Sequence, residues 1–337
     1  MKINKYSAYN INGLPKGCKY CIKGKKLVLF VSGICSRNCW YCSLSKKRKN
    51  KDIILFNERE KNSVKDLIKE IKESNANSMG ITGGDPLLFL SRTLKYAKAA
   101  KKEFGKSFHI HIYLPTKLVT KEKLKKLSEY IDEIRFNPKI TISDNDADFD
   151  LEKIRLASLF WKKQNIGIEL PMIPDKKQDF LEFIKKASKY IGFVNLNEFE
   201  LSETNSNITT KKYSLNEGGY TIKDSIKAGL FILNELKKQK SKLKIHLCTA
   251  ELKNNHQFKN RLKLHNILPF GYRTNEGLVK YLVIYKKIKN KDSYYDKQKK
   301  RTNLSEKLAR KLINKEKIFL IEEFPTYDRI EIEKQEI

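Results

Sequence analysis

KLVLFVSGICSRNCWYC, residues 26–42, is the stretch that decides the fold. It begins as a short β-rich run and ends in three cysteines, Cys35, Cys39 and Cys42, with the spacing C-x3-C-x2-C. Thiols placed this closely in a reducing compartment indicate a metal centre. A closed zinc site needs a fourth ligand, and no further Cys or His lies nearby, whereas three thiolates suit a [4Fe–4S] cluster with one open iron.

Outside this stretch, short apolar runs alternate with segments that carry apolar residues three or four apart. The expected strands are Lys26–Val31, Ser78–Thr82, Phe108–Tyr113, Glu133–Phe136, Gly167–Leu170, Phe193–Asn197 and Lys244–Leu247. The expected helices are Val64–Glu73, Ser91–Phe104, Lys121–Tyr130, Leu151–Lys163, Phe180–Tyr190 and Ile222–Lys240. This order predicts an α/β fold, a partial or complete (β/α) barrel, with a doubly wound open sheet as the alternative.

A second motif, Met79-Gly-Ile-Thr-Gly83-Gly84-Asp85-Pro86, closes the second expected strand. Taken alone, it reads as an ordinary turn in which glycine supplies unusual backbone angles. In a parallel barrel, however, the loops after the first two strands lie side by side at the rim where active sites form. We therefore expect the cysteine loop to face this glycine turn, whose backbone and carboxylate can hold an ammonium group.

These two motifs together resemble the radical S-adenosylmethionine (SAM) enzymes. More narrowly, Gly13-Leu-Pro-Lys-Gly-Cys18-Lys-Tyr-Cys21 and Pro325-Thr-Tyr-Asp-Arg329 resemble archaeal radical SAM proteins described as related to pyruvate formate-lyase activating enzymes. The resemblance implies that Cys35, Cys39 and Cys42 ligate a [4Fe–4S] cluster whose fourth iron binds SAM. It also implies an electron donor such as ferredoxin or flavodoxin.

The same resemblance assigns roles around the cofactor. Tyr41 would border the adenine, and Gly83, Gly84 and Asp85 would hold the methionyl ammonium group, with Asp in place of the usual Glu. One electron from the reduced cluster would cleave SAM into methionine and a 5′-deoxyadenosyl radical that takes hydrogen from the substrate.

Polar residues at other strand ends are further candidates for the same rim. Asn137 and Glu169 are expected to touch the cofactor. His109 and His111 alternate along one strand and therefore face the same side of it. Paired histidines of this kind are more often hydrogen-bonded core residues than catalysts. The sixth strand contributes a cluster of four: Asn195, Asn197, Glu198 and Glu200. Any of these could instead be a structural or solvated residue.

A second metal site is predicted from Cys18, Cys21, His246 and Cys248. If the barrel brings its first and last strands together, these residues could form a Cys3His zinc site. The rival interpretation is an auxiliary iron–sulfur cluster on the three cysteines. In the remaining alternative, Cys248 is a small buried hydrophobe and the first pair binds nothing.

The expected organisation is an N-terminal segment with the CxxC pair (1–24), a barrel (25–250) and a basic α+β appendage (251–337). The appendage should contain the extended segments Leu278–Ile284, Ile318–Glu322 and Ile330–Ile332 and the helix Ser305–Leu312. The segment Lys286–Arg301, rich in Lys and Tyr, is expected to be an exposed loop or linker.

The net charge of the chain bears on which class of molecule it binds. The chain of 337 residues has 70 Lys+Arg and 39 Asp+Glu, a net charge of +31, which attracts polyanions such as RNA, although lysine on solvated helix faces explains it equally well. The leading hypothesis is a radical SAM enzyme acting on a macromolecule, with tRNA favoured. The alternatives are a protein-radical activase of the pyruvate formate-lyase type and a non-catalytic metal-containing RNA-binding protein.

We expect a cytoplasmic protein, because no apolar run approaches the roughly 18 residues of a membrane span and no signal peptide is evident.

Overall fold

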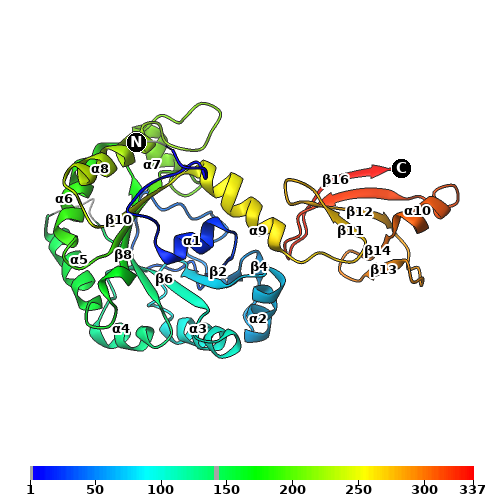
Figure 1. Cartoon of the computed structure of the whole chain (residues 1–337), viewed down its shortest axis with the longest axis horizontal. Helices are drawn as coiled ribbons and strands as arrows, with labels where there is room; N and C mark the ends of the chain where they lie inside the picture. The colour runs from blue at the N-terminus through cyan, green and yellow to red at the C-terminus, as the bar shows by residue number, and fades with distance from the viewer. Residues whose placement is uncertain (1–2, 140–143) are drawn as a thin grey trace.

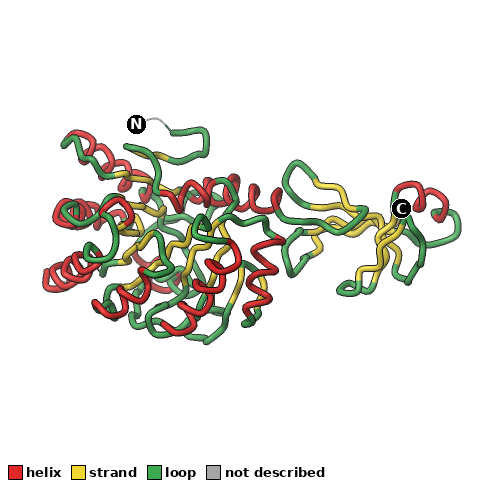
Figure 2. The backbone as a smooth tube through the Cα atoms, turned by 60° about the horizontal axis from the view of Figure 1, so that its bottom comes forward, coloured by secondary structure: helices red, strands yellow, loops and turns green. Residues whose placement is uncertain are grey.

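The computed structural model describes residues 3–139 and 144–337 and has two lobes joined through α9 (Lys259–Leu264) (Figure 1). The larger lobe is a curved sheet covered by helices, and the smaller lobe carries the C-terminus. Figure 2 shows the same division from another direction, with the smaller lobe built mainly of strands. The predicted domain boundaries at residues 24 and 250 remain predictions.

The larger lobe contains a 10-stranded sheet in the order β1-β10-β9-β8-β7-β6-β5-β2-β3-β4. Its central strands all run parallel, from β10 at one side to β2 at the other. Among the described residues β2 and β10 do not pair, so the barrel is partial, which is one of the two forms that the sequence left open. The parallel strands are β2 (Lys26–Phe30), β5 (Ser78–Thr82), β6 (His109–Pro115), β7 (Glu133–Asn137), β8 (Ile166–Met172), β9 (Phe193–Glu198) and β10 (Lys244–Cys248).

Helices connect these strands and cover the outside of the sheet (Figure 1). Ser63 and Thr120 start two of them, because each side chain accepts a hydrogen bond from a backbone N–H in the first turn. The helices of this lobe are α2 (Val64–Glu73), α3 (Leu90–Phe104), α4 (Lys121–Ser128), α5 (Asp144–Ala157), α6 (Lys177–Ala187), α7 (Ser206–Lys212) and α8 (Ser225–Lys238), with the short turns η1 (Lys163–Asn165), η2 (Pro174–Lys176) and η3 (Leu252–Phe258). The α5 helix begins and ends about six residues before its expected position.

An unpredicted N-terminal element fills the gap in the barrel. Strand β1 (Tyr9–Ile11) pairs antiparallel with β10, and α1 (Lys16–Ile22) follows it into the centre of the larger lobe in Figure 1. There α1 contacts β2, β5, β6 and η3. On the opposite edge, β3 (Leu55–Phe56) and β4 (Arg59–Glu60) form a hairpin beside β2. The N-terminal segment is therefore part of the barrel wall.

The smaller lobe is a six-stranded antiparallel sheet, with β13-β14-β12-β15-β16 in order and β11 paired to β12. One helix packs against it, capped by Ser305. The α+β character predicted for this region is observed. Its elements are β11 (Gly271–Arg273), β12 (Val279–Ile284), β13 (Ser293–Asp296), β14 (Arg301–Leu304), α10 (Glu306–Leu312), β15 (Phe319–Glu323) and β16 (Glu331–Glu336).

The expectation of an exposed loop over Lys286–Arg301 is correct only in part. Residues 286–291 lie outside strands and five of these six are exposed. The prediction misses β13, which forms a hairpin with β14, and the first residue of β14, Arg301, is fully buried. Arg301 donates to Glu323 at 2.5 Å and to Glu331 at 2.7 Å. Paired charge, which a hydrophobicity pattern does not register, orders this segment.

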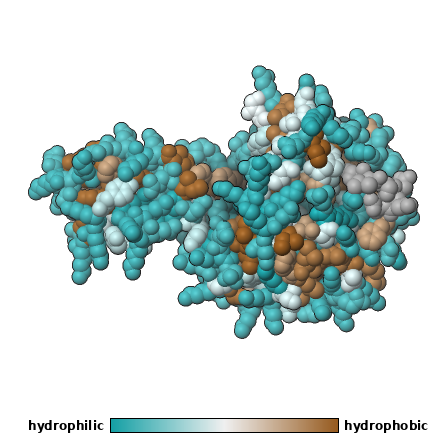
Figure 3. Space-filling model, turned by 180° about the vertical axis from the view of Figure 1, so that it is seen from behind, coloured by the Kyte–Doolittle hydropathy of each residue, from teal (hydrophilic) through white to brown (hydrophobic). Residues whose placement is uncertain are grey.

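Two further observations concern the surface. Hydrophilic side chains cover most of the face seen from behind, on both lobes (Figure 3). Within the described ranges, none of the helices is long and apolar enough to cross a membrane.

Candidate functional site

The cysteine loop and the glycine turn meet as predicted. Gly84 N donates to Ser32 O at 2.7 Å, and Asp85 N donates to Ile34 O at 3.0 Å. A Cβ atom on Gly84 would lie 2.2 Å from Ile34 O, a distance that real contacts exclude. Glycine at position 84 is therefore what allows the turn to approach the loop.

Loops after other strands hold the cysteine loop in place. Ser202 and Thr204, which follow β9, donate their hydroxyl groups to Cys42 O at 3.2 and 3.0 Å. On the other side, Arg37 donates to Asn137 O at 3.1 Å and pairs with buried Asp150 at 2.8 Å. Elements from both halves of the barrel therefore fix the position of the three thiols.

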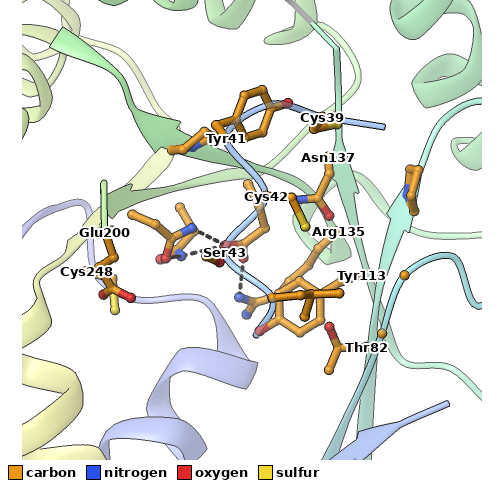
Figure 4. A pocket seen from close by; sticks show the side chains of 18 of the residues that line it. Cys39, Tyr41, Cys42, Ser43, Thr82, Tyr113, Arg135, Asn137, Glu200 and Cys248 are labelled. Carbon is orange, nitrogen blue, oxygen red and sulfur yellow. Dashed lines mark hydrogen bonds and ion pairs between the residues drawn. The ribbon is translucent and has the colours of Figure 1, made fainter. Parts of the chain in front are cut away.

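All six cysteines line one cavity of about 440 Å³. In Figure 4, Cys39, Tyr41 and Cys42 lie on one side of this cavity and Cys248 with Glu200 on another, while Arg135 and Tyr113 project from the barrel wall. Such a volume falls in the range of small-molecule sites, about 300 to 1,000 Å³. The barrel interior thus provides a binding site that reaches from the cysteine loop to the end of β10.

The spacing of Cys35, Cys39 and Cys42 is not that of an assembled zinc site. A tetrahedral zinc site with Zn–S bonds near 2.3 Å puts its sulfur atoms about 3.8 Å apart. In the described structure, the three Sγ atoms do not all lie within 4.8 Å of one another. Each thiolate of an iron–sulfur cluster binds a different iron, so a spacing wider than that of zinc ligands is compatible with a [4Fe–4S] cluster.

The thiols of Cys35, Cys39 and Cys42 are partly exposed to the cavity, and neighbouring groups shift the pKa of Cys35. Burial raises the pKa of the Cys35 thiol, and the backbone N–H of Arg37, which donates to its sulfur at 3.4 Å, opposes this shift. Nearby Asp85 and the other two cysteines raise the pKa further. A bound cation would relieve this mutual repulsion.

Most predicted cofactor contacts line the cavity. Tyr41, Gly83, Gly84, Asn137 and Glu169 all do so. The four predicted residues at the end of the sixth parallel strand also contribute: Asn195, Asn197, Glu198 and Glu200.

Asp85 is placed differently from its expectation. It does not line the cavity, and it is almost fully buried. One carboxylate oxygen accepts from Leu87 N at 2.9 Å, and the other accepts from the Ser36 hydroxyl. Burial raises the pKa of Asp85, against the effect of these donors. The carboxylate stabilises the turn, so the backbone of Gly83 and Gly84 remains to contact a ligand.

A buried polar network forms the wall between the two groups of cysteines. Arg135 donates to Glu133 at 2.7 Å and to Glu169 at 2.7 Å. The other oxygen of Glu169 accepts from Asn195 and Asn197 at 2.7 and 2.8 Å. Each buried charge in this network has an opposite charge or a hydrogen-bond donor, which a low-dielectric interior requires.

Below this network, His109, His111 and Glu133 form a compact group. Their ligand atoms lie within 4.8 Å of one another. Both oxygens of Glu133 are already engaged, by Gly17 N at 3.2 Å and by Arg135. Burial lowers the pKa of His109 to about 4 and that of His111 well below its usual value. Both histidines are buried, as expected of core residues. The expected hydrogen bonding is found for His111, whose Nε2 contacts the Tyr113 hydroxyl at 3.3 Å, but neither ring nitrogen of His109 has a hydrogen-bond partner among the described residues.

The residues of the predicted second metal site also line the cavity. Cys18 Sγ lies 3.4 Å from a guanidinium nitrogen of Arg135, and Cys248 Sγ accepts from Gln257 at 3.6 Å. Burial raises the pKa of each of these thiols to about 12. His246 Nδ1 contacts Asn195 Oδ1 at 2.8 Å, and burial lowers its pKa to about 3.

Sequence reasoning missed several cavity residues with functional groups, among them Lys26, Tyr113, Arg135 and Lys253. Alternation along strands could have found two of them. Tyr113 continues the series of His109 and His111, and Arg135 lies between Glu133 and Asn137 at every second position. Near Cys21 and Tyr113 the pKa of Lys26 is raised, although burial acts in the opposite direction.

Comparisons with known proteins agree with this site. A sequence profile described as "Radical SAM superfamily" matches residues 29–197. The chain is 39% identical over 291 residues to a protein of Methanocaldococcus jannaschii named "Putative glycyl-radical enzyme activating enzyme MJ0021". That match covers 82% of this chain and 75% of the relative.

Similar solved structures are more distant. One, "Native anSMEcpe with bound AdoMet and Cp18Cys peptide", is 17% identical with a TM-score of 0.39 and covers 64% of this chain and 59% of its own. Another is TsrM from Kitasatospora setae, a radical S-adenosylmethionine methyltransferase with cobalamin and a [4Fe–4S] cluster bound. It is 9% identical with a TM-score of 0.39, and the match covers 75% of this chain and 56% of that structure. The chain therefore spans less than two thirds of the length of either solved structure.

The cysteine spacing, the glycine turn that contacts it, the partial barrel and the matching profile agree with one another. The chain belongs to the radical SAM superfamily, and it is an enzyme whose cofactors are a [4Fe–4S] cluster and S-adenosylmethionine.

Proposed function

We propose that this enzyme activates a partner protein by removing a hydrogen atom from a glycine Cα of that partner. The observation that carries the proposal is the 39% identity, over 82% of the chain, to the Methanocaldococcus jannaschii protein named as a glycyl-radical enzyme activating enzyme. In the balanced reaction, one electron and SAM react with the glycine C–H bond. The products are methionine, 5′-deoxyadenosine and a glycyl radical.

Within this proposal the cysteine loop holds the cofactor. Cys35, Cys39 and Cys42 would bind three irons, and the cluster supplies the electron that breaks the sulfonium bond of SAM. Peptide groups of Gly83 and Gly84 face the cavity and are free of side chains that would block a methionyl group. Tyr41 would border the adenine at the opposite side of the loop.

The rest of the cavity would orient the glycine and exclude water. Arg135 is held between Glu133 and Glu169, so its position is fixed before any ligand binds. Glu200 and Lys253 pair at 2.5 Å near the end of β10. Fixed polar groups of this kind hold a reactive ligand in one geometry at little cost in reorganisation.

The tRNA hypothesis gains no support from the relatives, and part of its basis is removed. It depended on the net charge of +31 and on the basic run ending at Arg301. Arg301 is buried and paired with carboxylates, so it offers no charge to a phosphate, whereas Lys297 and Lys300 of the same run are exposed. Protein is the preferred class of substrate because of the named relative.

The test follows the hydrogen atom. Purified enzyme is incubated anaerobically with SAM, dithionite and soluble protein from cells of the source organism grown on α-deuterated glycine. We expect 5′-deoxyadenosine that carries one deuterium. Protein from cells grown on unlabelled glycine is the control, and total tRNA is assayed in parallel.

Two results would overturn the proposal. In one, the protein fraction stimulates 5′-deoxyadenosine without transferring deuterium, so the hydrogen comes from another position. In the other, tRNA stimulates the reaction and protein does not, which would restore the nucleic acid hypothesis.

A further inference from the structure

Cys18, Cys21 and Cys248 form a second group of thiols, distinct from the cysteine loop. Cys18 and Cys21 lie three residues apart on α1, which places them on one face of the helix. Cys248 is the last residue of β10, the strand on the far side of the barrel gap from β2. All three line the cavity that also contains the cysteine loop, and Figure 4 shows Cys248 at the opposite end from Cys39.

Cations lie among these thiols. Arg135 lies 3.4 Å from Cys18 Sγ, Lys253 is the charged group that acts most strongly on Cys248, and Lys26 lines the cavity that Cys21 also lines. Two of the cations also pair with carboxylates, Arg135 with Glu133 and Glu169, and Lys253 with Glu200.

Lys26 differs from the other two cations. Throughout the described ranges, no ion pair joins its ammonium group to a carboxylate, and it lines the same cavity as Cys21 and Tyr113. A partly buried ammonium group is stabilised by an anionic partner. Lys26 is therefore available to an anionic group bound in this cavity.

His246 adds a donor with a defined direction. Asn195 Nδ2 donates to Glu169 Oε2 at 2.7 Å, which leaves its Oδ1 as the acceptor for His246 Nδ1 at 2.8 Å. The proton of His246 therefore sits on Nδ1, and Nε2 carries a lone pair. In the described chain this buried Nε2 has no hydrogen-bond partner, and His246 lines the cavity. An unpartnered, buried acceptor of this kind points to a ligand.

The spacing is not that of an assembled zinc site. No three of Cys18, Cys21, His246 and Cys248 have all their ligand atoms within 4.8 Å of one another in the described structure, whereas a zinc ion holds its sulfur ligands about 3.8 Å apart. Thiolates that bind different irons of one cluster are spaced more widely, so an iron–sulfur cluster requires less rearrangement of these side chains than zinc does.

We propose that Cys18, Cys21 and Cys248 bind a second [4Fe–4S] cluster, with His246 Nε2 directed at the iron that has no cysteine. This second cluster shares the cavity with the SAM-binding cluster. The inference goes beyond the proposed function, because it concerns the metal content of the chain and holds for any substrate.

The test counts metal and does not depend on activity. Three proteins are reconstituted anaerobically with iron and sulfide: the wild type, Cys35→Ala/Cys39→Ala/Cys42→Ala, and Cys18→Ser/Cys21→Ser/Cys248→Ser. We expect about eight iron and eight sulfide per wild-type chain, and about four of each in either triple variant. Circular dichroism verifies that each variant is folded.

If a variant fails to fold, the wild type alone still tests whether the chain binds one cluster or two. Two clusters contribute twice the iron of one to its Mössbauer spectrum. The variant His246→Gln should keep about eight iron but shift the spectrum of one cluster, while His256→Gln, a change outside the cavity, should shift neither. A wild-type chain with about four iron, or with one zinc and four iron, would overturn the proposal.

Discussion

The barrel interior and the C-terminal lobe both bury charged side chains, but they arrange them differently. In the C-terminal lobe, Arg301 and Arg329 form ion pairs with Asp296, Glu323 and Glu331, so the charges are paired, although Arg301 Nε and Arg329 Nη2 have no hydrogen-bond partner among the described residues. In the barrel, the buried charges line a cavity together with thiols and an unpartnered histidine nitrogen. We infer that the buried charges of the C-terminal lobe stabilise the fold, whereas those of the barrel line a site that can bind a ligand.

The largest expected effect comes from the cysteine loop. Cys39→Ala removes one of three proposed cluster ligands, so reductive cleavage of SAM should fall by at least about a thousandfold, because the electron source is lost. The measurement is 5′-deoxyadenosine per enzyme under dithionite. Residual activity within about tenfold of wild type would show that this cysteine does not hold the catalytic cluster.

A smaller but still large effect is expected at the glycine turn. In Gly84→Ala, the new Cβ would meet Ile34 O at 2.2 Å, so the turn must move away from the cysteine loop. We expect SAM cleavage to fall by about ten- to a hundredfold, since displacements near 1 Å have this effect on reacting groups. Gly105→Ala, where a Cβ meets nothing within 4 Å, is the control. Its positive φ still costs some stability, so both variants are compared by rate per folded enzyme.

The converse experiment changes the C-terminal lobe. Arg301→Met leaves Glu323 and Asp296 with Arg329 alone and Glu331 without its partner, so the unfolding free energy should fall by at most about 3 to 5 kcal/mol, the cost of an unpaired buried charge. SAM cleavage per folded enzyme should stay close to wild type. Chemical denaturation and the 5′-deoxyadenosine assay measure the two quantities, with exposed Lys300→Met as the control. If activity fell as steeply as stability, the separation between the two regions would be wrong.

The smallest expected effect is the dependence of barrel stability on pH. Burial lowers the pKa of His109 to about 4 and of His246 to about 3, against about 6.5 in the unfolded chain. Between pH 6.5 and these folded values the unfolded chain binds more protons, so stability falls as the pH drops, by at most about 1.4 kcal/mol per pH unit for each histidine.

This loss should be confined to the barrel, because residues 271–337 contain no histidine. Hydrogen exchange at pH 7.5 and 5.5 compares the two lobes. Equal loss of protection in β6 and β12 would contradict the account.

Whether an element could be predicted from the sequence depends on the interactions that stabilise it. Strand β5 and helix α2 match their predicted bounds, Ser78–Thr82 and Val64–Glu73, because apolar periodicity reports directly on burial. Helix α1 was missed, since its seven residues become ordered by docking into the barrel gap. The β13–β14 hairpin was missed because ion pairs order it.

The site shows the same division. Cysteine spacing located the loop, and glycines located the turn that contacts it. Arg135 and Lys26 were missed because charged residues are expected on the surface unless a partner is visible. Their partners, Glu169 and Cys21, become visible only when the barrel closes around α1. The carboxylate of Asp85 was misplaced for a related reason, as local spacing does not reveal that Ser36 and Leu87 N engage it.

The central claim is that SAM binds directly to the cluster held by the cysteine loop. Electron paramagnetic resonance of the dithionite-reduced enzyme, with SAM labelled by ¹⁵N at its amino group, tests this most directly, using Cys18→Ser/Cys21→Ser/Cys248→Ser to remove any contribution from the second group of thiols. The account predicts that SAM alters the cluster signal and that electron–nuclear double resonance detects coupling to the ¹⁵N nucleus. A signal that SAM leaves unchanged, without coupling to the label, would contradict it.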